Sequence, residues 1–242
     1  CEISPRVIIK RLFAELEHST GLMDLFEKQD PDFIMGKNYY YRILFGVEEF
    51  LLQREFATEA YIWLLKLDDK NFGYTSNSPE DVFKKVLCTW RNYSVFSIST
   101  EKIRLAELAF EHSRNAWEIV YKNLPGSNGS IVGKLHAPKY RKCVEESDTT
   151  YDELNKSTVG YINLLIKHAE FMPERWIKLI KYSDDVDQDT RTKIIDSFLI
   201  ESIQMNDSEK IAVKDSIRRL IYRHRYFASA SWAMPEEEVL VY

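Results

Sequence analysis

Four aspartates near the C-terminal end have the spacing of a calcium-binding loop. In the segment YSDDVDQDTRTKIIDSF, Asp185, Asp187 and Asp189 alternate, and a fourth follows at the twelfth position of the run. That fourth residue is Asp196. A calcium loop needs glycine near its centre for a sharp turn, and Thr190 stands there, whose β-branched side chain resists a positive φ. We therefore predict an acidic turn between two helices, whose last aspartate caps the second helix, and no calcium site.

Soft metal ligands and nucleophile motifs are sparse. No two histidines have HxxxH spacing, and no serine or cysteine motif of a hydrolase occurs. The cysteines are Cys1, Cys88 and Cys143, and the histidines are His18, His112, His136, His168 and His224. The sequence therefore predicts a protein without metal or cofactor that is not an enzyme. A zinc site completed by cysteines of a partner chain is the alternative.

A strongly basic helix is predicted near the C-terminus. The segment KIAVKDSIRRLIYRHRY, residues 210–226, carries six Lys or Arg residues and one Asp. Its predicted buried stripe is Val213, Ile217, Leu220, Ile221 and Phe227, with His224 inside it. Lys214, Arg218 and Arg225 line one flank of the exposed face, Arg219 and Arg223 line the other, and Tyr222 and Tyr226 lie between them.

These seven exposed residues are the candidate partner-binding site. Arginines beside tyrosines suit phosphates and stacked bases, and they suit acidic peptides equally well through bidentate contacts to carboxylates. The alternative is a solvated face neutralised by the protein's own acids, such as Glu236 to Glu238. We expect a protein partner rather than a nucleic acid.

Length and composition favour an ordinary globular protein. The chain has 242 residues, 45% of them hydrophobic, and a net charge of −5, which does not indicate a global nucleic-acid or membrane binder. The odd number of widely spaced cysteines favours a reducing compartment, the nucleus or the cytosol. No apolar run is long enough to cross a bilayer, so we expect an intracellular protein without membrane contact.

Hydrophobic residues recur at helical spacing almost throughout the chain, so we predict an all-α fold, a compact multi-helix bundle. We expect one domain over residues 1–242, with a core of about 4–228 and a short tail at 229–242. The tail keeps apolar residues, as an exchangeable or docking strand would. The predicted helices are 5–18, 22–29, 38–53, 56–67, 80–96, 100–123, 149–171, 174–183, 190–204 and 207–228. Two of the starts are marked by capping residues: Ser78 stands directly before Pro79, and Asn206 followed by Glu209 has the form of a capping box.

One predicted helix is apolar on nearly every side. In NYYYRILFGVEEFLLQ, residues 38–53, Glu48 falls among Tyr41, Leu44 and Leu52 on a helical wheel. Such a helix is surrounded by others, and a carboxylate inside it needs a partner. We predict that Glu48 is buried and paired through a salt bridge or a hydrogen bond from a tyrosine. A carboxylate tuned for function is the alternative.

Two segments, AELEHSTGLMDLF and YYYRILFGVEEFL, resemble the opening of the haem-oxygenase-like family. In that family a histidine late in the first helix ligates haem, and a later helix is rich in Tyr and Glu. The resemblance covers about the first fifth of the chain. It implies a helical cofactor enzyme with His18 as the haem ligand, whereas the other interpretation of His18 is an exposed histidine at a helix end.

Taken together, these patterns predict a non-enzymatic adaptor or scaffold that docks peptide segments of other proteins in grooves between helices. Aromatic residues, which serve as anchors in protein interfaces, make up 13% of the chain. Helical adaptors of this size occur in chromatin- and telomere-type complexes, which is an analogy between folds and no more. A homo-oligomer is also compatible with the sequence. The remaining alternatives are the cofactor enzyme and a nucleic-acid-binding protein that uses the basic helix.

Overall fold

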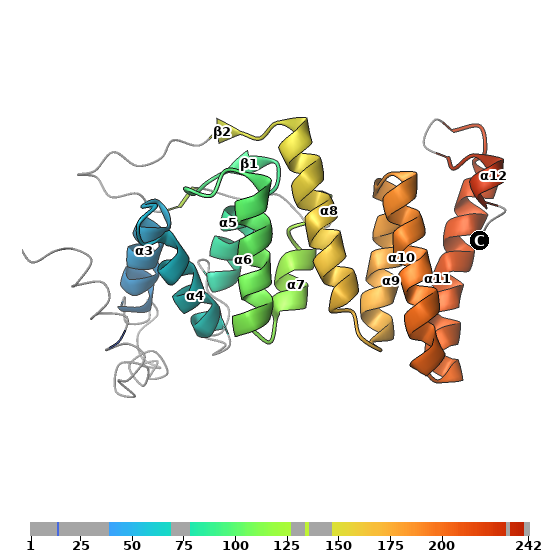
Figure 1. The fold of residues 1–242 in the computed structure, drawn as a ribbon, viewed down its shortest axis with the longest axis horizontal. Coiled ribbons are helices and arrows are strands. Elements are labelled where there is room, and N and C mark those ends of the chain that lie inside the picture. The colour runs from blue at the N-terminus through green and yellow to red at the C-terminus, as the bar shows by residue number, and fades with distance from the viewer. Residues whose placement is uncertain are drawn as a thin grey trace, which may run out of the picture. The chain divides into compact units, whose positions relative to one another are not determined.

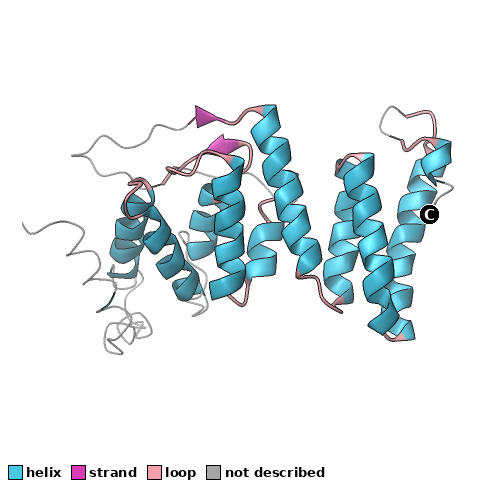
Figure 2. Ribbon diagram, viewed as in Figure 1, coloured by secondary structure: helices cyan, strands magenta, loops and turns pink. Residues whose placement is uncertain are grey.

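The computed structural model describes residues 14, 39–68, 78–126, 134–135, 147–230 and 233–239, and these are mostly helical (Figures 1 and 2). The all-α prediction is therefore confirmed. The elements are α3 (Tyr39–Leu51), α4 (Ala57–Asp68), α5 (Pro79–Val86), β1 (Arg91–Asn92), α6 (Ser99–His112), α7 (Ala116–Tyr121), β2 (Ser147–Asp148), α8 (Tyr151–Lys167), α9 (Pro173–Tyr182), the 3₁₀ turn η1 (Ser183–Asp185), α10 (Gln188–Glu201), the 3₁₀ turn η2 (Ser202–Gln204), α11 (Asp207–Tyr226) and α12 (Glu236–Val239). The two short strands pair antiparallel, with Arg91 opposite Asp148. None of the helices in the described ranges is both long and apolar enough to span a membrane.

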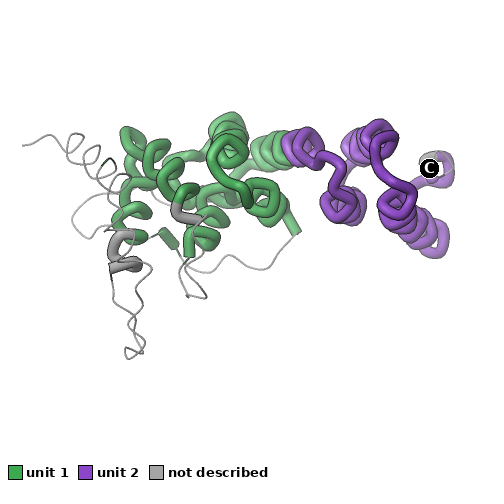
Figure 3. Tube along the Cα trace, turned by 90° about the horizontal axis from the view of Figure 1, so that it is seen from below, with its two compact units in different colours: residues 1–161 green, residues 162–242 purple. Residues whose placement is uncertain are grey.

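The chain divides into two compact units, residues 1–161 and 162–242, which are coloured separately in Figure 3. The boundary between them lies within α8. The expectation of one domain over the whole chain stays a prediction.

In the first unit, α4 packs against α3, α5 and α6, and α7 packs against α5 and α6. Large aromatic side chains fill the space between these helices. Tyr61 of α4 meets Phe83 of α5 edge to face, with the ring centroids 5.7 Å apart. Trp117 of α7 is 2% exposed and stacks on Tyr121, with the centroids 5.2 Å apart. Each such aromatic pair contributes about 0.5–1.5 kcal/mol beyond the area that it buries.

The prediction of one helix over residues 80–96 is wrong, because α5 ends early and the chain turns into β1. Two distant side chains bind the carbonyl groups of this turn. Tyr161 Oη donates to Leu87 O at 2.9 Å, and Lys102 Nζ donates to Cys88 O at 2.6 Å. No glycine or proline follows α5 to mark its end. The end of this helix is therefore decided by tertiary contacts.

The predicted helix over residues 100–123 is also divided, into α6 and α7. The break lies at Ser113, whose Oγ accepts a hydrogen bond from Asn115 N at 3.1 Å. Short polar side chains of this kind offer the backbone a local alternative to helical hydrogen bonds. The apolar spacing continues through the break, which explains why the pattern alone predicted one helix.

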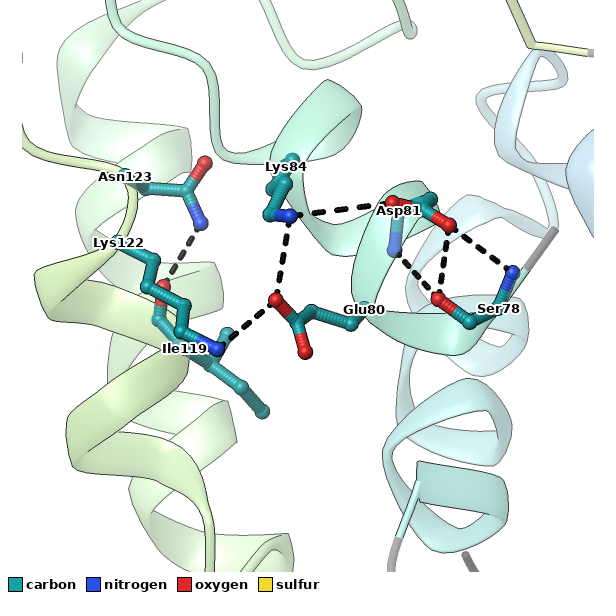
Figure 4. A network of polar contacts seen from close by, with 7 residues as sticks. All are labelled: Ser78, Glu80, Asp81, Lys84, Ile119, Lys122 and Asn123. Atoms are coloured by element: carbon teal, nitrogen blue, oxygen red, sulfur yellow. Dashed lines mark hydrogen bonds and ion pairs between the residues drawn. The ribbon is translucent and has the colours of Figure 1, made fainter. Parts of the chain in front are cut away.

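The start of α5 confirms the helix start predicted at Ser78 (Figure 4). Ser78 Oγ accepts from Asp81 N at 3.2 Å, and the Asp81 carboxylate accepts from Ser78 N at 3.2 Å, which completes a capping box. Glu80 links this end to α7, because it pairs with Lys122 at 2.8 Å and with Lys84 at 3.1 Å. Partial burial raises the pKa of Glu80, but the two ammonium groups outweigh it and hold this pKa below its usual value.

Gly160 of α8 lies directly against Ile103 of α6. A Cβ atom at this glycine would overlap Ile103 Cδ1 and approach Cγ1 to 2.5 Å, and isoleucine in a helix has little freedom to move away. We expect Gly160→Ala to destabilise the protein by about 1 kcal/mol net, because overpacking outweighs the helix propensity of alanine. In an Ile103→Ala background the same change should stabilise. Urea denaturation of the four proteins tests this, and an equal loss in both backgrounds would contradict the contact.

In the second unit, α9 packs against both α10 and α11. Trp176 of α9 is fully buried and meets Phe198 of α10, with the ring centroids 5.8 Å apart. Trp176 Nε1 also donates to Glu170 O at 2.8 Å. Glu170 has a φ of 53°, in the left-handed region, and lies in the turn between α8 and α9. The indole of Trp176 therefore stabilises both the interior of the unit and the turn that leads into α9.

The aspartate run forms the predicted acidic turn, between α9 and α10. The capping residue is Asp187, which accepts from Thr190 N at 2.8 Å, and not the last aspartate as predicted. The reason is that α10 begins directly after it, so Asp189 and Asp196 both lie within the helix. Asp196 is roughly 12 Å along α10 from its start, at ~1.5 Å per residue. The helix thus separates the carboxylates that a calcium loop would bring together, including Asp185 in η1.

Candidate partner-binding site

The helix that carries the predicted binding residues is α11. It starts at a capping box, as predicted, since Glu209 N donates to Asn206 Oδ1 at 3.0 Å and Asn206 N donates to the Glu209 carboxylate at 3.0 Å. Its buried residues are Val213, Ile217, Leu220 and His224, each at most 9% exposed. These belong to the predicted stripe, which faces the interior of the second unit.

Phe227, predicted as part of that stripe, is 47% exposed instead. The helix ends at Tyr226, and as the C-cap Phe227 has φ −106° and ψ 34°, which takes its side chain out of the helical register. Its ring packs edge-on against Tyr226, with the centroids 4.8 Å apart. The tail, predicted as a docking strand, forms the short helix α12 in its described part, with Met234 and Val239 buried.

All seven predicted binding residues are exposed: Lys214, Arg218, Arg219, Tyr222, Arg223, Arg225 and Tyr226. Tyr222 and Tyr226 are 68% and 69% exposed and lie one turn apart, on the side of α11 opposite its buried stripe. Their rings stack, with centroids 5.9 Å apart and planes 21° apart. We call these two tyrosines and Phe227 the aromatic ridge. Exposed aromatic groups of this kind are typical of interaction surfaces.

One acid of α11 itself pairs with two arginines beside the ridge. Asp215 accepts from Arg218 at 2.5 Å and from Arg219 at 2.8 Å, and these arginine side chains are 80% and 77% exposed. The hydrogen bond from Arg218 holds the pKa of Asp215 below its usual value. Ion pairs this exposed contribute at most about 1 kcal/mol, so both arginines can exchange Asp215 for a partner's anion. Lys214 and Arg225 make no ion pair within the described part of the chain.

A second acid, Asp184 in η1, binds α11 from the turn after α9. Its carboxylate accepts hydrogen bonds from Arg223 and, at 2.5 Å, from His224 Nε2. His224 Nδ1 accepts from Met234 N at 3.0 Å, so these bonds assign the imidazole proton to Nε2. Both nitrogens of His224 are therefore engaged inside the fold. Among the described side chains, the acids that pair with the arginines of this helix are Asp184 and Asp215, whereas Glu236 and Glu237 of the tail pair with none of them.

A pocket of about 200 Å³ opens between α9 and α11 on the flank of the ridge that carries Arg219 and Arg223. We call it the α9–α11 pocket. It is lined by Ile180, Lys181, Asp184, Ser216, Arg219, Leu220 and Arg223. Of these, sequence analysis identified only the two arginines as site residues. Asp184 and Arg223 are 39 residues apart, and only the packing of α9 on α11 brings them together. Lys181, an exposed lysine in the last turn of α9, was the sequence signal for this pocket. It indicates a binding site only when α11 is known to be the neighbouring helix.

A further cluster of ionisable groups, in the first unit, is closed to solvent. Lys102 is 1% exposed and donates to Cys88 O at 2.6 Å and to Asn92 Oδ1 at 2.8 Å. Burial lowers the pKa of Lys102 to about 8 and raises the pKa of the Cys88 thiol above its usual value. Depressed lysine pKa values occur at catalytic sites, but here the ammonium group closes the turn after α5 and no surface leads to it. We interpret Lys102 as a residue that stabilises this turn.

Metal ligands are not assembled in the described part of the chain. No group of three His, Cys, Asp or Glu side chains lies close enough there to hold a metal ion. His18, the haem ligand implied by the family resemblance, and Cys1, His136 and Cys143 lie outside the described residues. His168 is partly buried, and this burial holds its pKa below the usual value.

Removal of the Asp184 carboxylate should destabilise the second unit. Asp184→Ala leaves the buried Nε2–H of His224 without its acceptor, and a buried donor left unsatisfied costs about 1–3 kcal/mol. The matched control is Asp215→Ala, which removes a carboxylate from exposed pairs on the same helix and should cost at most about 1 kcal/mol. Urea denaturation measures both. Equal losses would contradict a structural role for the contact between Asp184 and His224.

Comparison with known proteins finds no match. No protein-family model, no curated protein and no solved structure is significantly similar to this chain. The function is therefore argued from the chemistry of α11 and its surroundings.

Proposed function

We propose that this protein is a non-enzymatic adaptor that docks short segments of partner proteins on the surface formed by α9 and α11. The observation that carries the proposal is the aromatic ridge, in which Tyr222 and Tyr226 are 68% and 69% exposed and stack on each other between two rows of cations. Burying an aromatic side chain contributes roughly 1.5–3 kcal/mol, so this ridge can supply the apolar centre of an interface. Tyrosine also loses little conformational entropy on binding, because it has only two side-chain torsions.

The charges beside the ridge favour an acidic partner segment. Arg218 and Arg219 are held only by exposed ion pairs to Asp215, and bidentate contacts to a partner's carboxylates can replace these pairs. Lys214 and Arg225 add cations on one flank. A segment that combines acidic with aromatic or aliphatic residues would therefore match both features of this surface.

A nucleic acid is the competing partner, because stacked tyrosines and arginines also suit bases and phosphates. Two features favour a protein segment. The whole chain carries a net charge of −5, which repels a polyanion at long range. The cations of α11 are also partly neutralised by Asp184 and Asp215. Membership of a chromatin- or telomere-type assembly is proposed on the analogy between helical adaptors alone.

The proposal is tested by identifying a partner and reconstituting the complex. Partners would be captured from the native cell, identified by mass spectrometry, and reduced to the shortest purified segment that still binds. Its affinity should fall at least about tenfold for Tyr222→Ala/Tyr226→Ala, because the loss of two buried rings exceeds 1.4 kcal/mol. The matched control is Tyr151→Ala, which removes a tyrosine that is 86% exposed at the start of α8, and it should leave the affinity unchanged.

Salt dependence separates the two classes of partner. The affinity for a protein segment should change by less than about tenfold between about 50 and about 200 mM salt, because charge acts mainly on the association rate. A nucleic acid held by several phosphate contacts would lose about a thousandfold or more over the same range. A random-sequence DNA or RNA that binds tightly at physiological salt, and is lost in Arg218→Glu/Arg219→Glu/Arg223→Glu, would overturn the adaptor function.

A further inference from the structure

The α9–α11 pocket combines cationic walls with an apolar floor. Ile180 is fully buried and Leu220 is 7% exposed beneath the opening. Lys181 comes from α9, whereas Arg219 and Arg223 come from one flank of α11, one turn apart. The pocket therefore gathers three cations from two helices around one opening.

The charge of the lining is positive by two units. Lys181, Arg219 and Arg223 stand against the single lining carboxylate of Asp184. Arg219 also pairs with Asp215 outside the lining, in an exposed ion pair that a partner's anion can replace. That carboxylate accepts from both Arg223 and His224, with one oxygen for each, so it positions the guanidinium group of Arg223. Arg223 remains 55% exposed. The hydroxyl of Ser216 adds one more hydrogen-bonding group to the lining.

The end of α9 beside the pocket would by itself disfavour an anion, because helix C-termini carry partial negative charge. Arg191 offsets this effect. Its guanidinium group is 7% exposed and donates to Ser183 O at 2.9 Å and to Val186 O at 3.1 Å, directly after α9. A buried cation therefore binds two carbonyl groups of the turn that follows α9.

We propose that the α9–α11 pocket receives a phosphoserine side chain of the partner segment, a step that rests on the proposed docking function. A phosphomonoester carries a charge of about −1.5 to −2 at neutral pH, which matches the formal excess of two positive charges in the lining. A glutamate carries half of that charge and would leave one cation uncompensated. Arginine forks and a lysine from two different elements are the groups that recognise phosphate in phosphopeptide-binding proteins.

The test uses the full chain and two pairs of probes. The first pair is free O-phosphoserine and serine, with binding read from the NMR signals of the α9 and α11 backbone amides. The second pair is a fluorescent peptide pool of random sequence around a central phosphoserine and the same pool with a central glutamate. We expect O-phosphoserine, but not serine, to shift signals around Lys181 and Arg219. The phosphoserine pool should bind at least about tenfold more tightly than the glutamate pool.

Two charge-reversal variants localise the binding. Lys181→Glu/Arg219→Glu changes the pocket, and Lys167→Glu/Lys193→Glu makes the same change of net charge on exposed lysines of α8 and α10, outside the binding surface. Neither variant touches the bonds from Arg223 and His224 to Asp184. The first should lower the affinity for the phosphoserine pool at least about tenfold, and the second by less than about threefold. Equal losses would show a diffuse electrostatic attraction and overturn the proposal.

The outcomes also separate this proposal from the docking function. A partner segment that binds through Tyr222 and Tyr226 with equal affinity before and after dephosphorylation would contradict the phosphoserine site. The same result would support the docking function. If O-phosphoserine binds at Lys181 and Arg219 but no partner is lost in Tyr222→Ala/Tyr226→Ala, the phosphate site is supported and the docking function is contradicted.

Discussion

The stability of the wild-type protein should rise, relative to that of a Lys102→Met variant, by about 2 kcal/mol between about pH 7 and about pH 9.5. The reason is the burial of Lys102, which is 1% exposed and has a pKa of about 8 in place of its usual 10.5. Its neutral amine can still donate to Cys88 O and to Asn92 Oδ1, so deprotonation removes the cost of burying a charge and keeps both bonds.

The direction follows from the two pKa values. Between pH of about 8 and 10.5, the unfolded chain holds a proton on Lys102 that the folded protein has released. The folded state is favoured as this proton becomes scarcer, so the free energy of unfolding rises with pH. Each unit of pKa difference contributes about 1.4 kcal/mol, which limits the whole effect to about 3 kcal/mol.

Other buried groups act in the opposite direction at higher pH. Burial raises the pKa of Cys88 and of Tyr161, so their ionisation in the unfolded chain lowers stability above pH of roughly 9 and 10 respectively. The comparison of wild type with Lys102→Met removes these contributions, because both proteins contain them. Urea denaturation at each pH gives the free energies. Lys156→Met, which changes an exposed lysine, is the control and should show no such difference. A difference that stays flat with pH would contradict the burial of an ionisable amine.

Replacement of Glu48 by alanine should cost about 3 kcal/mol or more. The prediction that this residue is buried is confirmed, since it is 1% exposed in α3, and it has an interaction partner. Truncation leaves the partner group without its carboxylate at a site that is 1% exposed, and a group that loses its partner at a buried site is expensive. Surface glutamates cost about half a kcal/mol at most on the same change, so a loss of that size would contradict the burial.

A second variant identifies the kind of partner at Glu48. Glu48→Gln keeps the shape and one carbonyl oxygen but removes the charge. If the partner is a tyrosine hydroxyl, glutamine can still accept its hydrogen bond, and the loss should stay near about 1 kcal/mol. If the partner is a cation, Glu48→Gln should cost nearly as much as Glu48→Ala, because an unpaired charge remains in the core. Thermal and urea denaturation of the two variants decide between these cases.

Much of the secondary structure could be predicted because its causes are local. The starts at Ser78 and Asn206 were recognisable, since Ser78 stands directly before a proline and Asn206 stands three residues before Glu209, as in a capping box. The exposed face of α11 followed from its apolar spacing, which places Tyr222 and Tyr226 opposite Val213 and its neighbours. The same reasoning failed at Phe227, because the helical register stops where the helix ends.

What only the tertiary structure decided depends on residues far apart in the chain. The end of α5 depends on donors from Lys102 and Tyr161, and no local signal announces them. The α9–α11 pocket likewise needs Lys181 beside Arg219, which the packing of two helices provides. Helical periodicity and caps report interactions between residues within about one turn of each other, so they identify which side of a helix is buried. They carry no information on which helix covers that side, and both the buried lysine and the walls of the pocket are consequences of that pairing.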